Sequence, residues 1–312
     1  MSVCLKRADM AAATDLPVLI LGESGTGKTL LARAIHNSSL RGACSFVSFS
    51  SPALSDTLLD SQLFGHERGA FTGAHQGLKG KFELADGGTL FIDEIADMSS
   101  AAQGKILRAV EYGEFERLGS EALRVADVRL ISATYHPLSR LSQSERFRRD
   151  LFFRISGIVL TIPPLRERLR DLPLLVAAEI GRASRAQRKT IIGLDKAAAD
   201  RIFAHSWPGN LRELNRVIDT AVALATQNVI DREALLLEPS SSIAQAGDET
   251  IPSVGEILPL AEIERRHIVR VLERFRGNKR RAAQALDVSR STLDRKLCRV
   301  AAPRRSETVA PF

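Results

Sequence analysis

One glycine-rich run combines the residue types and the spacing that hold the phosphates of a nucleotide. It follows an apolar segment at residues 17–21 and consists of Gly22, Glu23, Ser24, Gly25, Thr26, Gly27, Lys28 and Thr29. In this G-x-x-x-x-G-K-[ST] pattern, the glycines let successive backbone N–H groups turn toward phosphate oxygens. Lys28 would reach the β- and γ-phosphates, and the Thr29 hydroxyl would ligate Mg²⁺. The sequence therefore predicts a phosphate loop for a nucleoside triphosphate, leading into a helix at residues 29–37.

A second run supplies the carboxylates that such a loop requires. Residues 87–94 read as an apolar strand that ends in Asp93 and Glu94. Asp93 is expected to hold Mg²⁺ through its water shell, and Glu94 to polarise the attacking water. An acidic turn after a strand is common by itself. The prediction therefore depends on the phosphate loop that precedes it.

Between these two runs lies a short loop of small residues around one aromatic and one hydroxyl side chain. Its members are Gly69, Ala70, Phe71, Thr72, Gly73 and Ala74. Small residues favour a mobile loop, and burying an exposed Phe71 ring on a partner would contribute about 2–3 kcal/mol. The alternative is a tight turn with Phe71 packed into the protein's own core.

With this loop the chain resembles the AAA+ activators of sigma-54-dependent transcription, because residues 69–74 spell that family's GAFTGA signature. The resemblance covers nearly the whole chain. It implies that the nucleotide is ATP and that Phe71 and Thr72 touch sigma-54. It also implies that Thr134, which follows an expected strand at 129–133, senses the γ-phosphate.

Residues 147–154 match the family segment that carries two arginine fingers, Arg148 and Arg154. A guanidinium supplied across a subunit interface neutralises charge that develops on the γ-phosphoryl group. The resemblance therefore implies a homo-oligomeric ring, usually a hexamer. Either arginine could instead pair with a carboxylate on its own helix, and we expect that role for Arg149.

Two further segments resemble family motifs that respond to the state of the bound nucleotide. Residues 207–214 match the second-sensor motif, in which Arg212 contacts bound phosphate and reports hydrolysis to the lid. An exposed helix arginine paired with a neighbour is the alternative. Residues 163–168 match a hinge between subdomains, and Arg117 matches a position implicated in signalling between protomers.

The net charge of +7 is concentrated at the C-terminal end. Residues 260–312 hold 14 Lys/Arg and 6 Asp/Glu, a balance of +8, so the other 259 residues sum to −1. A nearly neutral body with a compact basic end favours an ATPase joined to a nucleic-acid binder. A solvated basic tail is the alternative.

Within this basic end, residues 277–297 resemble a Fis-type helix-turn-helix. Ala282, Ala283 and Leu286 would form the apolar face of its first helix, and Ser289 would cap the recognition helix. The residues expected to meet base edges and phosphates of double-stranded DNA are Arg290, Ser291, Thr292, Arg295 and Lys296. A two-helix packing module with a charged face is the alternative.

Short apolar runs alternate with longer helical patterns through the first 170 residues, which predicts an α/β fold with a parallel sheet. The expected strands are 18–21, 46–49, 89–92, 129–133 and 158–161. Expected helices at 172–185, 195–205 and 211–225 form a small all-α lid. We divide the chain into an AAA+ α/β ATPase subdomain (1–164), a helical lid (165–237), a linker (238–256) and a helix-turn-helix domain (257–300).

The composition is that of an ordinary globular protein, 44% hydrophobic and 26% charged over 312 residues. No apolar run is long enough to cross a bilayer, and no signal-peptide core is present, so no membrane partner is expected. Cys4, Cys44 and Cys298 lie far apart in the sequence, which favours a reduced, cytoplasmic location.

Four features depart from the family pattern. Ser50 stands where the family usually has an asparagine that restrains the catalytic glutamate, and serine has no amide. Tyr135 replaces an asparagine of the first sensor, and Asp287 replaces a common turn glycine. Only 21 residues precede the phosphate loop, so the domain is expected to be truncated or to enclose the base less completely. With no receiver domain before it, we expect no regulation or a regulator acting in trans.

The resemblance as a whole implies a ring-forming ATPase that remodels the sigma-54 RNA polymerase holoenzyme for promoter opening while bound to upstream DNA. A hypothesis from a different class remains. Ser50 and Tyr135 would then mark a decayed ATPase, which acts as a non-hydrolysing DNA-binding regulator or as a partner subunit in a mixed ring.

Overall fold

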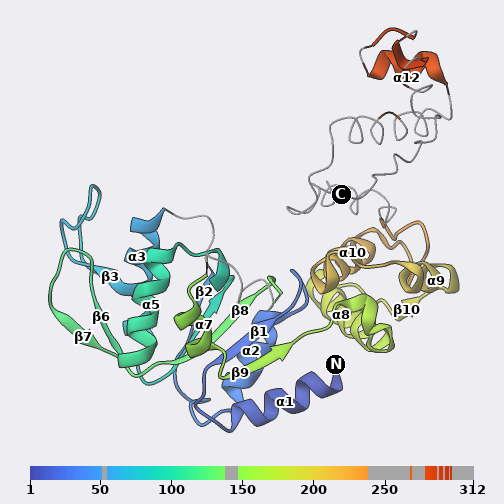
Figure 1. Ribbon diagram of the computed structural model, residues 1–312. Helices are drawn as coiled ribbons and strands as arrows, with labels where there is room; N and C mark the ends of the chain where they lie inside the picture. Colours follow the sequence, from blue (N-terminus) through green and yellow to red (C-terminus); the bar gives the residue numbers. More distant parts are fainter. Residues whose placement is uncertain are drawn as a thin grey trace, which may run out of the picture. The chain divides into compact units, whose positions relative to one another are not determined.

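The computed structural model divides the chain into two units, Met1–Ala244 and Gln245–Phe312 (Figure 1). It describes residues 1–50, 55–137 and 147–237 and, within the second unit, residues 268, 278–286, 288–290, 292–294 and 296. Within these residues, no helix is both long enough and apolar enough to cross a lipid bilayer.

Among the described residues of the first unit, five parallel strands form one sheet in the order β2-β5-β8-β1-β9. They are β1 (Val18–Leu21), β2 (Phe46–Ser50), β5 (Thr89–Asp93), β8 (Arg129–Thr134) and β9 (Ile158–Thr161). Each predicted strand is confirmed to within one residue, because each is a short apolar or β-branched run. The pattern left the strand order open, and the structure places β8 between β1 and β5.

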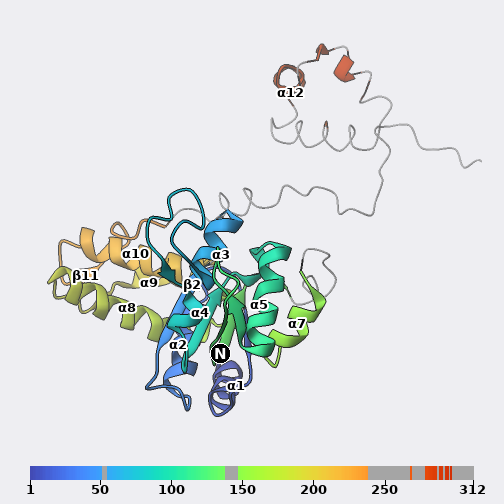
Figure 2. The same cartoon turned by 90° about the vertical axis from the view of Figure 1, so that its left-hand side faces the viewer.

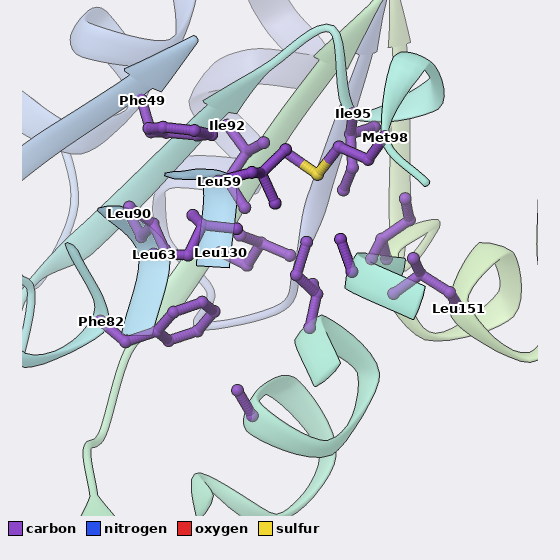
Figure 3. Close-up of a cluster of buried hydrophobic side chains, with 14 of the residues drawn as sticks. Phe49, Leu59, Leu63, Phe82, Leu90, Ile92, Ile95, Met98, Leu130 and Leu151 are labelled. Atoms are coloured by element: carbon purple, nitrogen blue, oxygen red, sulfur yellow. The ribbon is translucent and has the colours of Figure 1, made fainter. Parts of the chain in front are cut away.

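Alternate side chains of the strands pack on opposite faces of the sheet, as the two-residue period of a strand requires. Leu19 and Leu21 belong to the core on one face, and Val18 and Ile20 belong to the core on the other. Figure 3 shows the first of these cores, where Phe82 and its neighbours pack together. Because both faces are buried, the sheet is a rigid platform for groups at the strand ends.

Helices cover both faces of the sheet (Figure 1 and Figure 2). Those that contribute to the core of Val18 and Ile20 are α1 (Ser2–Ala12) and α2 (Lys28–Asn37). Those on the opposite face are α3 (Asp56–Phe64), α4 (Lys81–Leu84), α5 (Ser100–Tyr112) and α7 (Arg149–Ile155). The ends of α5 follow capping rules, since Ser99 accepts a hydrogen bond from the N–H of Ala102 and Gly113 has a φ of +73°.

Residues 55–137 also form two short antiparallel hairpins. One pairs β3 (Gly65–His66) with β4 (Leu78–Lys79), and the other pairs β6 (Glu114–Glu116) with β7 (Leu123–Val125). The sequence did not predict them, because strands of two or three residues carry too little periodicity. The tip loop, defined as residues 69–74, lies between β3 and β4.

Over residues 165–237, which the structure describes without a gap, three helices form the lid, close to their predicted ranges. They are α8 (Leu172–Gln187), α9 (Lys196–Ala204) and α10 (Asn210–Leu224). Its short elements are the 3-10 turns η2 (Leu165–Glu167) and η3 (Leu169–Asp171) and the paired strands β10 (Gly193–Leu194) and β11 (Val229–Ile230). Trp207 is fully buried in the lid core, which the three helices share.

In the second unit, the described part contains α12 (Lys279–Ala285). Asn278 caps this helix, because its side chain accepts a hydrogen bond from the N–H of Arg281. Ala282 and Ala283 are buried, which confirms the predicted apolar face.

The predicted start of the recognition helix is also confirmed. The Oγ of Ser289 accepts a hydrogen bond from the N–H of Thr292 at 3.1 Å, the contact of an N-cap. Leu286 is partly buried against the same small core. Asp287, which stands where the family commonly has a turn glycine, lies outside the described residues.

Candidate functional site

The phosphate loop, residues 22–29, connects the carboxyl end of β1 to the first turn of α2. Gly25 and Gly27 have φ values of +78° and +100°, in the left-handed region that glycine adopts without strain. Helix α2 begins at Lys28 with Gly27 as its N-cap, so the positive end of its dipole faces the loop. The local backbone therefore has the shape that phosphate binding requires.

Lys28 and Glu94 are in direct contact across the site. The Nζ of Lys28 lies 3.0 Å from Oε1 of Glu94 and donates to the carbonyl of Gly22 at 3.1 Å. The other oxygen of Glu94 accepts a hydrogen bond from the backbone N–H of Tyr135 at 3.0 Å. Glu94 has a φ of +53°, a strained conformation for a side-chain-bearing residue. Such strain is typical of functional sites.

The other predicted phosphate and metal groups lie at the same edge of the sheet. Asp93 ends β5, and its Oδ1 accepts a hydrogen bond from the N–H of Glu94 at 3.1 Å. Thr134 ends β8, is fully buried, and accepts a hydrogen bond from the N–H of His136 at 3.1 Å. Thr29 is exposed in the first turn of α2. Because β1, β8 and β5 are neighbours, their carboxyl ends bring these groups together.

A cavity of about 360 Å³ has walls from both the phosphate loop and the lid. Lys28, Thr29, Asp93 and Glu94 line it from the α/β side, and Arg212 lines it from the lid. The cavity is of the size that holds small ligands. A hydroxyl and a carboxylate are hard oxygen ligands, so Thr29 and Asp93 fit Mg²⁺ by their chemistry.

Basic residues of the hinge and the lid form hydrogen bonds with the phosphate loop. Arg166 donates two hydrogen bonds to the Glu23 carboxylate, at 2.8 and 2.5 Å. These bonds hold the pKa of Glu23 below its ordinary value. Arg212 donates to the Oγ of Ser24 at 2.8 Å, so the predicted second-sensor arginine lies at the loop.

Asn210 is a site residue that the sequence reasoning did not single out. It is fully buried, has a φ of +51°, and is the first residue of α10. Its one local signal is its position between Gly209 and a helical pattern, where asparagine tolerates a left-handed backbone. Its contacts with distant segments could not be read from that signal.

Of the two predicted arginine fingers, Arg148 is the N-cap of α7 and Arg154 lies in its last turn. Neither Arg148 nor Arg154 is among the described residues that line the cavity of their own chain. Arg148 pairs with Asp150 at 2.7 Å, which holds the pKa of that carboxyl below its ordinary value. The pair with a carboxylate of this helix, which we expected for Arg149 and left as the alternative for Arg148, is made by Arg148, the N-cap residue, with Asp150. Arg154 lies 3.4 Å from two carbonyl oxygens near the end of α5.

The tip loop is held by its own backbone. The N–H of Gly69 donates to the carbonyl of Ala74 at 2.8 Å, and the N–H of Ala74 donates to that of Phe71 at 3.0 Å. A Cβ added to Gly69 or Gly73 would meet nothing within 4 Å. The Phe71 ring is partly exposed and lies edge-on to His66, with 5.0 Å between ring centroids. The alternative in which Phe71 is buried in the core is therefore wrong.

Ion pairs hold the base of the hairpin that carries the tip loop. Arg117 donates two hydrogen bonds of 2.7 Å to Glu83 and one of 3.0 Å to Glu67. Arg124 lies 3.3 Å from the same Glu67 carboxylate. The Arg117 guanidinium holds the pKa of Glu83 below its ordinary value, and the pKa of Arg117 is raised in turn. Arg117 therefore connects the two hairpins.

The predicted DNA-binding residues are described in part. Arg290 is exposed, and Thr292 and Lys296 are partly exposed. Ser291 and Arg295 lie outside the described residues. The three described side chains are therefore at least partly accessible to a partner.

The fold and the site together define a P-loop nucleotide-binding module of the AAA+ type, with its helical lid. Three family models match consecutive stretches of the chain. They are the sigma-54 interaction domain (1–161), the AAA+ ATPase lid domain (166–250) and the Fis family of bacterial regulatory proteins (259–299). The first stretch alone covers more than half of the 312 residues. The chain belongs to the family of sigma-54-dependent transcriptional activators.

Known relatives agree with this assignment. The chain is 43% identical over 302 residues to the transcriptional regulatory protein ZraR of Klebsiella oxytoca, covering 96% of this chain and 67% of the relative. It is 42% identical over 300 residues to the regulatory protein AtoC of Escherichia coli K12, covering 95% of this chain and 65% of the relative.

Among solved structures, the chain is similar to NtrX from Brucella abortus in complex with ATP. The TM-score is 0.69 at 31% identity, over 97% of this chain and 68% of that one. The chain thus spans about two thirds of the length of each of these three relatives.

Proposed function

We propose that the chain is a ring-forming, Mg²⁺-dependent ATPase that binds upstream DNA and remodels sigma-54 RNA polymerase holoenzyme for promoter opening. The observation that carries the proposal is that two features occur in one chain. They are the contact of 3.0 Å between the phosphate-loop Lys28 and Glu94, and a partly exposed Phe71 on the tip loop. The first feature serves a reaction at a nucleotide, and the second can meet a protein partner.

Within the nucleotide site, the roles follow from position. Lys28 would turn from Glu94 to the β- and γ-phosphates, and the Glu94 carboxylate would then orient and deprotonate the attacking water. Thr29 and Asp93 would hold Mg²⁺, which supplies charge neutralisation on the phosphates when bound. Thr134, at the end of the intervening strand, would sense the γ-phosphate.

The fingers would act on a neighbouring protomer. Arg148 and Arg154 are not among the described residues that line their own cavity, whereas Arg212 is. We therefore propose a homo-oligomeric ring, a hexamer by analogy with the family, in which both fingers reach the adjacent γ-phosphate. An arginine delivered in trans links turnover to assembly.

Sigma-54 and DNA would bind different parts of the chain. Phe71 and Thr72 of the tip loop would touch sigma-54. Double-stranded DNA would be read by the helix-turn-helix domain (257–300) through Arg290, Ser291, Thr292, Arg295 and Lys296. This domain would be joined by a linker (238–256) to the lid (165–237) and the ATPase subdomain (1–164), and a regulator acting in trans could control the ring.

The proposal is tested by measuring ATP hydrolysis across a range of protein concentrations, with Glu94→Gln as the matched variant. We expect specific activity that rises with concentration, because the fingers act between protomers. We expect the variant to bind ATP but to lose turnover, since the carboxylate is the base. Undiminished turnover in the variant would contradict the role of Glu94.

A second candidate function is favoured by Tyr135 and Ser50. The carboxylate of Glu94 is held by a backbone N–H of Tyr135 and by Lys28, in a chain where Ser50 lacks the amide of the family's asparagine. The chain would then be a non-hydrolysing DNA-binding regulator or a partner in a mixed ring. No turnover at any concentration, with DNA binding retained, is the result that favours this candidate.

A further inference from the structure

The outer side of the phosphate loop is hydrogen-bonded to the hinge and the lid at three successive carbonyl groups. The carbonyl of Ser24 accepts from Nδ2 of Asn210 at 3.1 Å, and that of Gly25 accepts from the N–H of Leu211 at 2.9 Å. The carbonyl of Thr26, next in the chain, accepts from Arg168 at 3.0 Å.

These three bonds fix which way the loop's N–H groups point. All described peptide bonds are trans, so each C=O and the N–H of the following residue point in opposite directions. Since the carbonyls of residues 24–26 point toward the hinge and the lid, the N–H groups of Gly25 and Gly27 point to the opposite, inner side of the loop. The N–H of Thr26 donates instead to the carbonyl of Glu23, at 3.3 Å. That inner side is where backbone N–H groups of such a loop bind phosphate oxygens. The lid therefore contributes to the geometry of the anion site, and Leu211 also lines the cavity.

Asn210 joins three segments through one side chain. Its Oδ1 accepts from the N–H of Leu165 in the hinge at 2.8 Å. Its Nδ2 donates to the carbonyl of Ser24 and also to Oε2 of Glu23 at 3.2 Å, an oxygen that accepts from Arg166 as well. The amide orientation is unambiguous, because an N–H faces its oxygen and two acceptors face its nitrogen.

Steric fit supports the same connection. A Cβ on Gly25 would lie 2.3 Å from the carbonyl oxygen of Gly209 and 3.1 Å from Cβ of Arg212. The start of α10 and the loop are therefore in van der Waals contact that only glycine allows. The buried Asn210 lies within this contact, between Gly209 and Arg212.

We infer that Asn210 is a positioning residue, which sets the phosphate-binding geometry of the loop from the lid. Affinity for the polyphosphate group of a nucleoside di- or triphosphate then depends on the lid being docked through Asn210. The inference deepens the proposed ATPase function and rests on its nucleotide site. It does not require hydrolysis.

The test uses Asn210→Asp, which keeps the shape and the acceptor for Leu165 but removes the donor to Ser24 and Glu23. A negative charge then faces the Glu23 carboxylate. We expect the Kd of a fluorescent ADP analogue, measured on the full chain, to rise at least tenfold. The control is Asn228→Asp, the same change at an exposed asparagine of the lid, which should leave the Kd within twofold.

Rescue separates this role from a defect in lid folding. Adding Glu23→Gln to Asn210→Asp places an amide opposite the new carboxylate. We therefore expect the Kd of the double variant to be at least threefold lower than that of Asn210→Asp alone. A lid that simply misfolds would not be restored by a change in the phosphate loop. Lost affinity without rescue would overturn the inference.

Hydrogen exchange gives a readout that needs no nucleotide. Asn210→Asp should speed exchange at the amides of residues 24–27 and at the start of α10, and Asn228→Asp should not. Unchanged exchange and unchanged affinity in folded Asn210→Asp would also overturn the inference. Wild-type protein that binds ADP but never hydrolyses ATP would contradict the proposed ATPase function while leaving the role of Asn210 intact.

Discussion

The phosphate loop and the tip loop are both glycine-rich, yet the space around their glycines differs. Gly25 and Gly73 share the left-handed region, with φ values of +78° and +103°. A Cβ on Gly25 would lie 2.3 Å from the carbonyl oxygen of Gly209, whereas a Cβ on Gly73 would meet nothing within 4 Å. Gly25 is needed for backbone conformation and for close approach, and Gly73 is needed for conformation alone.

The difference corresponds to what each loop would do. A phosphate site works best when its N–H groups are fixed before the ligand arrives, because no reorganisation is then needed. A loop that presents Phe71 to a partner and later withdraws it needs few contacts beyond its own backbone. Glycine in a sequence therefore signals a backbone conformation, and the neighbours decide whether that conformation is rigid.

The largest effect should come from Gly25→Ala. The added Cβ would be strained at a positive φ and would collide with the lid. Together these effects should weaken the packing of the lid against the loop by about 3 kcal/mol. We expect loss of measurable nucleotide binding and a lower midpoint of thermal unfolding. Binding of the fluorescent ADP analogue at wild-type strength would contradict the account of a crowded loop.

Arg117→Ala should have the next largest effect, at the base of the tip loop. The Arg117 and Glu83 side chains are 12% and 14% exposed, so removal leaves a mostly buried carboxylate without its main partner. We expect a loss of about 2 kcal/mol in the free energy of unfolding by urea, with ADP affinity kept. Arg108→Ala, which breaks pairs of a side chain that is 51% exposed, is the control and should cost less.

Gly73→Ala isolates the cost of conformation without crowding. We expect the free energy of unfolding to fall by about 1 kcal/mol, because the new side chain is strained at a positive φ. ADP affinity should not change, because no atom lies near the new Cβ. Gly193→Ala is the control, since that site also has open space and no positive φ. A cost for Gly73→Ala equal to that of Gly25→Ala would remove the contrast between the loops.

The smallest expected effect is in the pH dependence of stability. The folded-state pKa of Glu83 is lowered, chiefly by its hydrogen bonds to Arg117. Its contribution to stability is therefore present above the unfolded-state pKa, about 4.3, and is lost as the pH falls through the folded-state value. We expect the free energy of unfolding of the wild-type protein to exceed that of Glu83→Gln by about 0.5 kcal/mol at neutral pH. The difference should vanish in acid. A difference that widens as the pH falls would contradict this sign.

Much of the fold was predictable because its signals are local. The five parallel strands are runs of apolar and β-branched residues, and the phosphate loop is a contiguous pattern of residue types that can be recognised without its neighbours. The cap at Ser289 was likewise predicted and found. The β3–β4 and β6–β7 hairpins were missed, because their pairing depends on segments that carry no periodicity of their own.

The site was predictable in its parts and not in its connections. Lys28 and Glu94 were each assigned from neighbouring residues, but their contact and the hold of Tyr135 on Glu94 depend on strand order. Arg148 rather than Arg149 pairs with Asp150, because the start of α7 decides which side chain reaches it.

The sequence by itself determined the phosphate loop, the acidic strand end, the tip loop and the order of domains, since each is a property of adjacent residues. Only the tertiary structure decided that Asn210 holds the phosphate loop and that Gly25 is crowded while Gly73 is free of neighbours. The physical reason is that side-chain hydrogen bonds and steric contacts join atoms close in space. Residues 24 and 210 are distant in sequence and meet only where the lid lies against the phosphate loop.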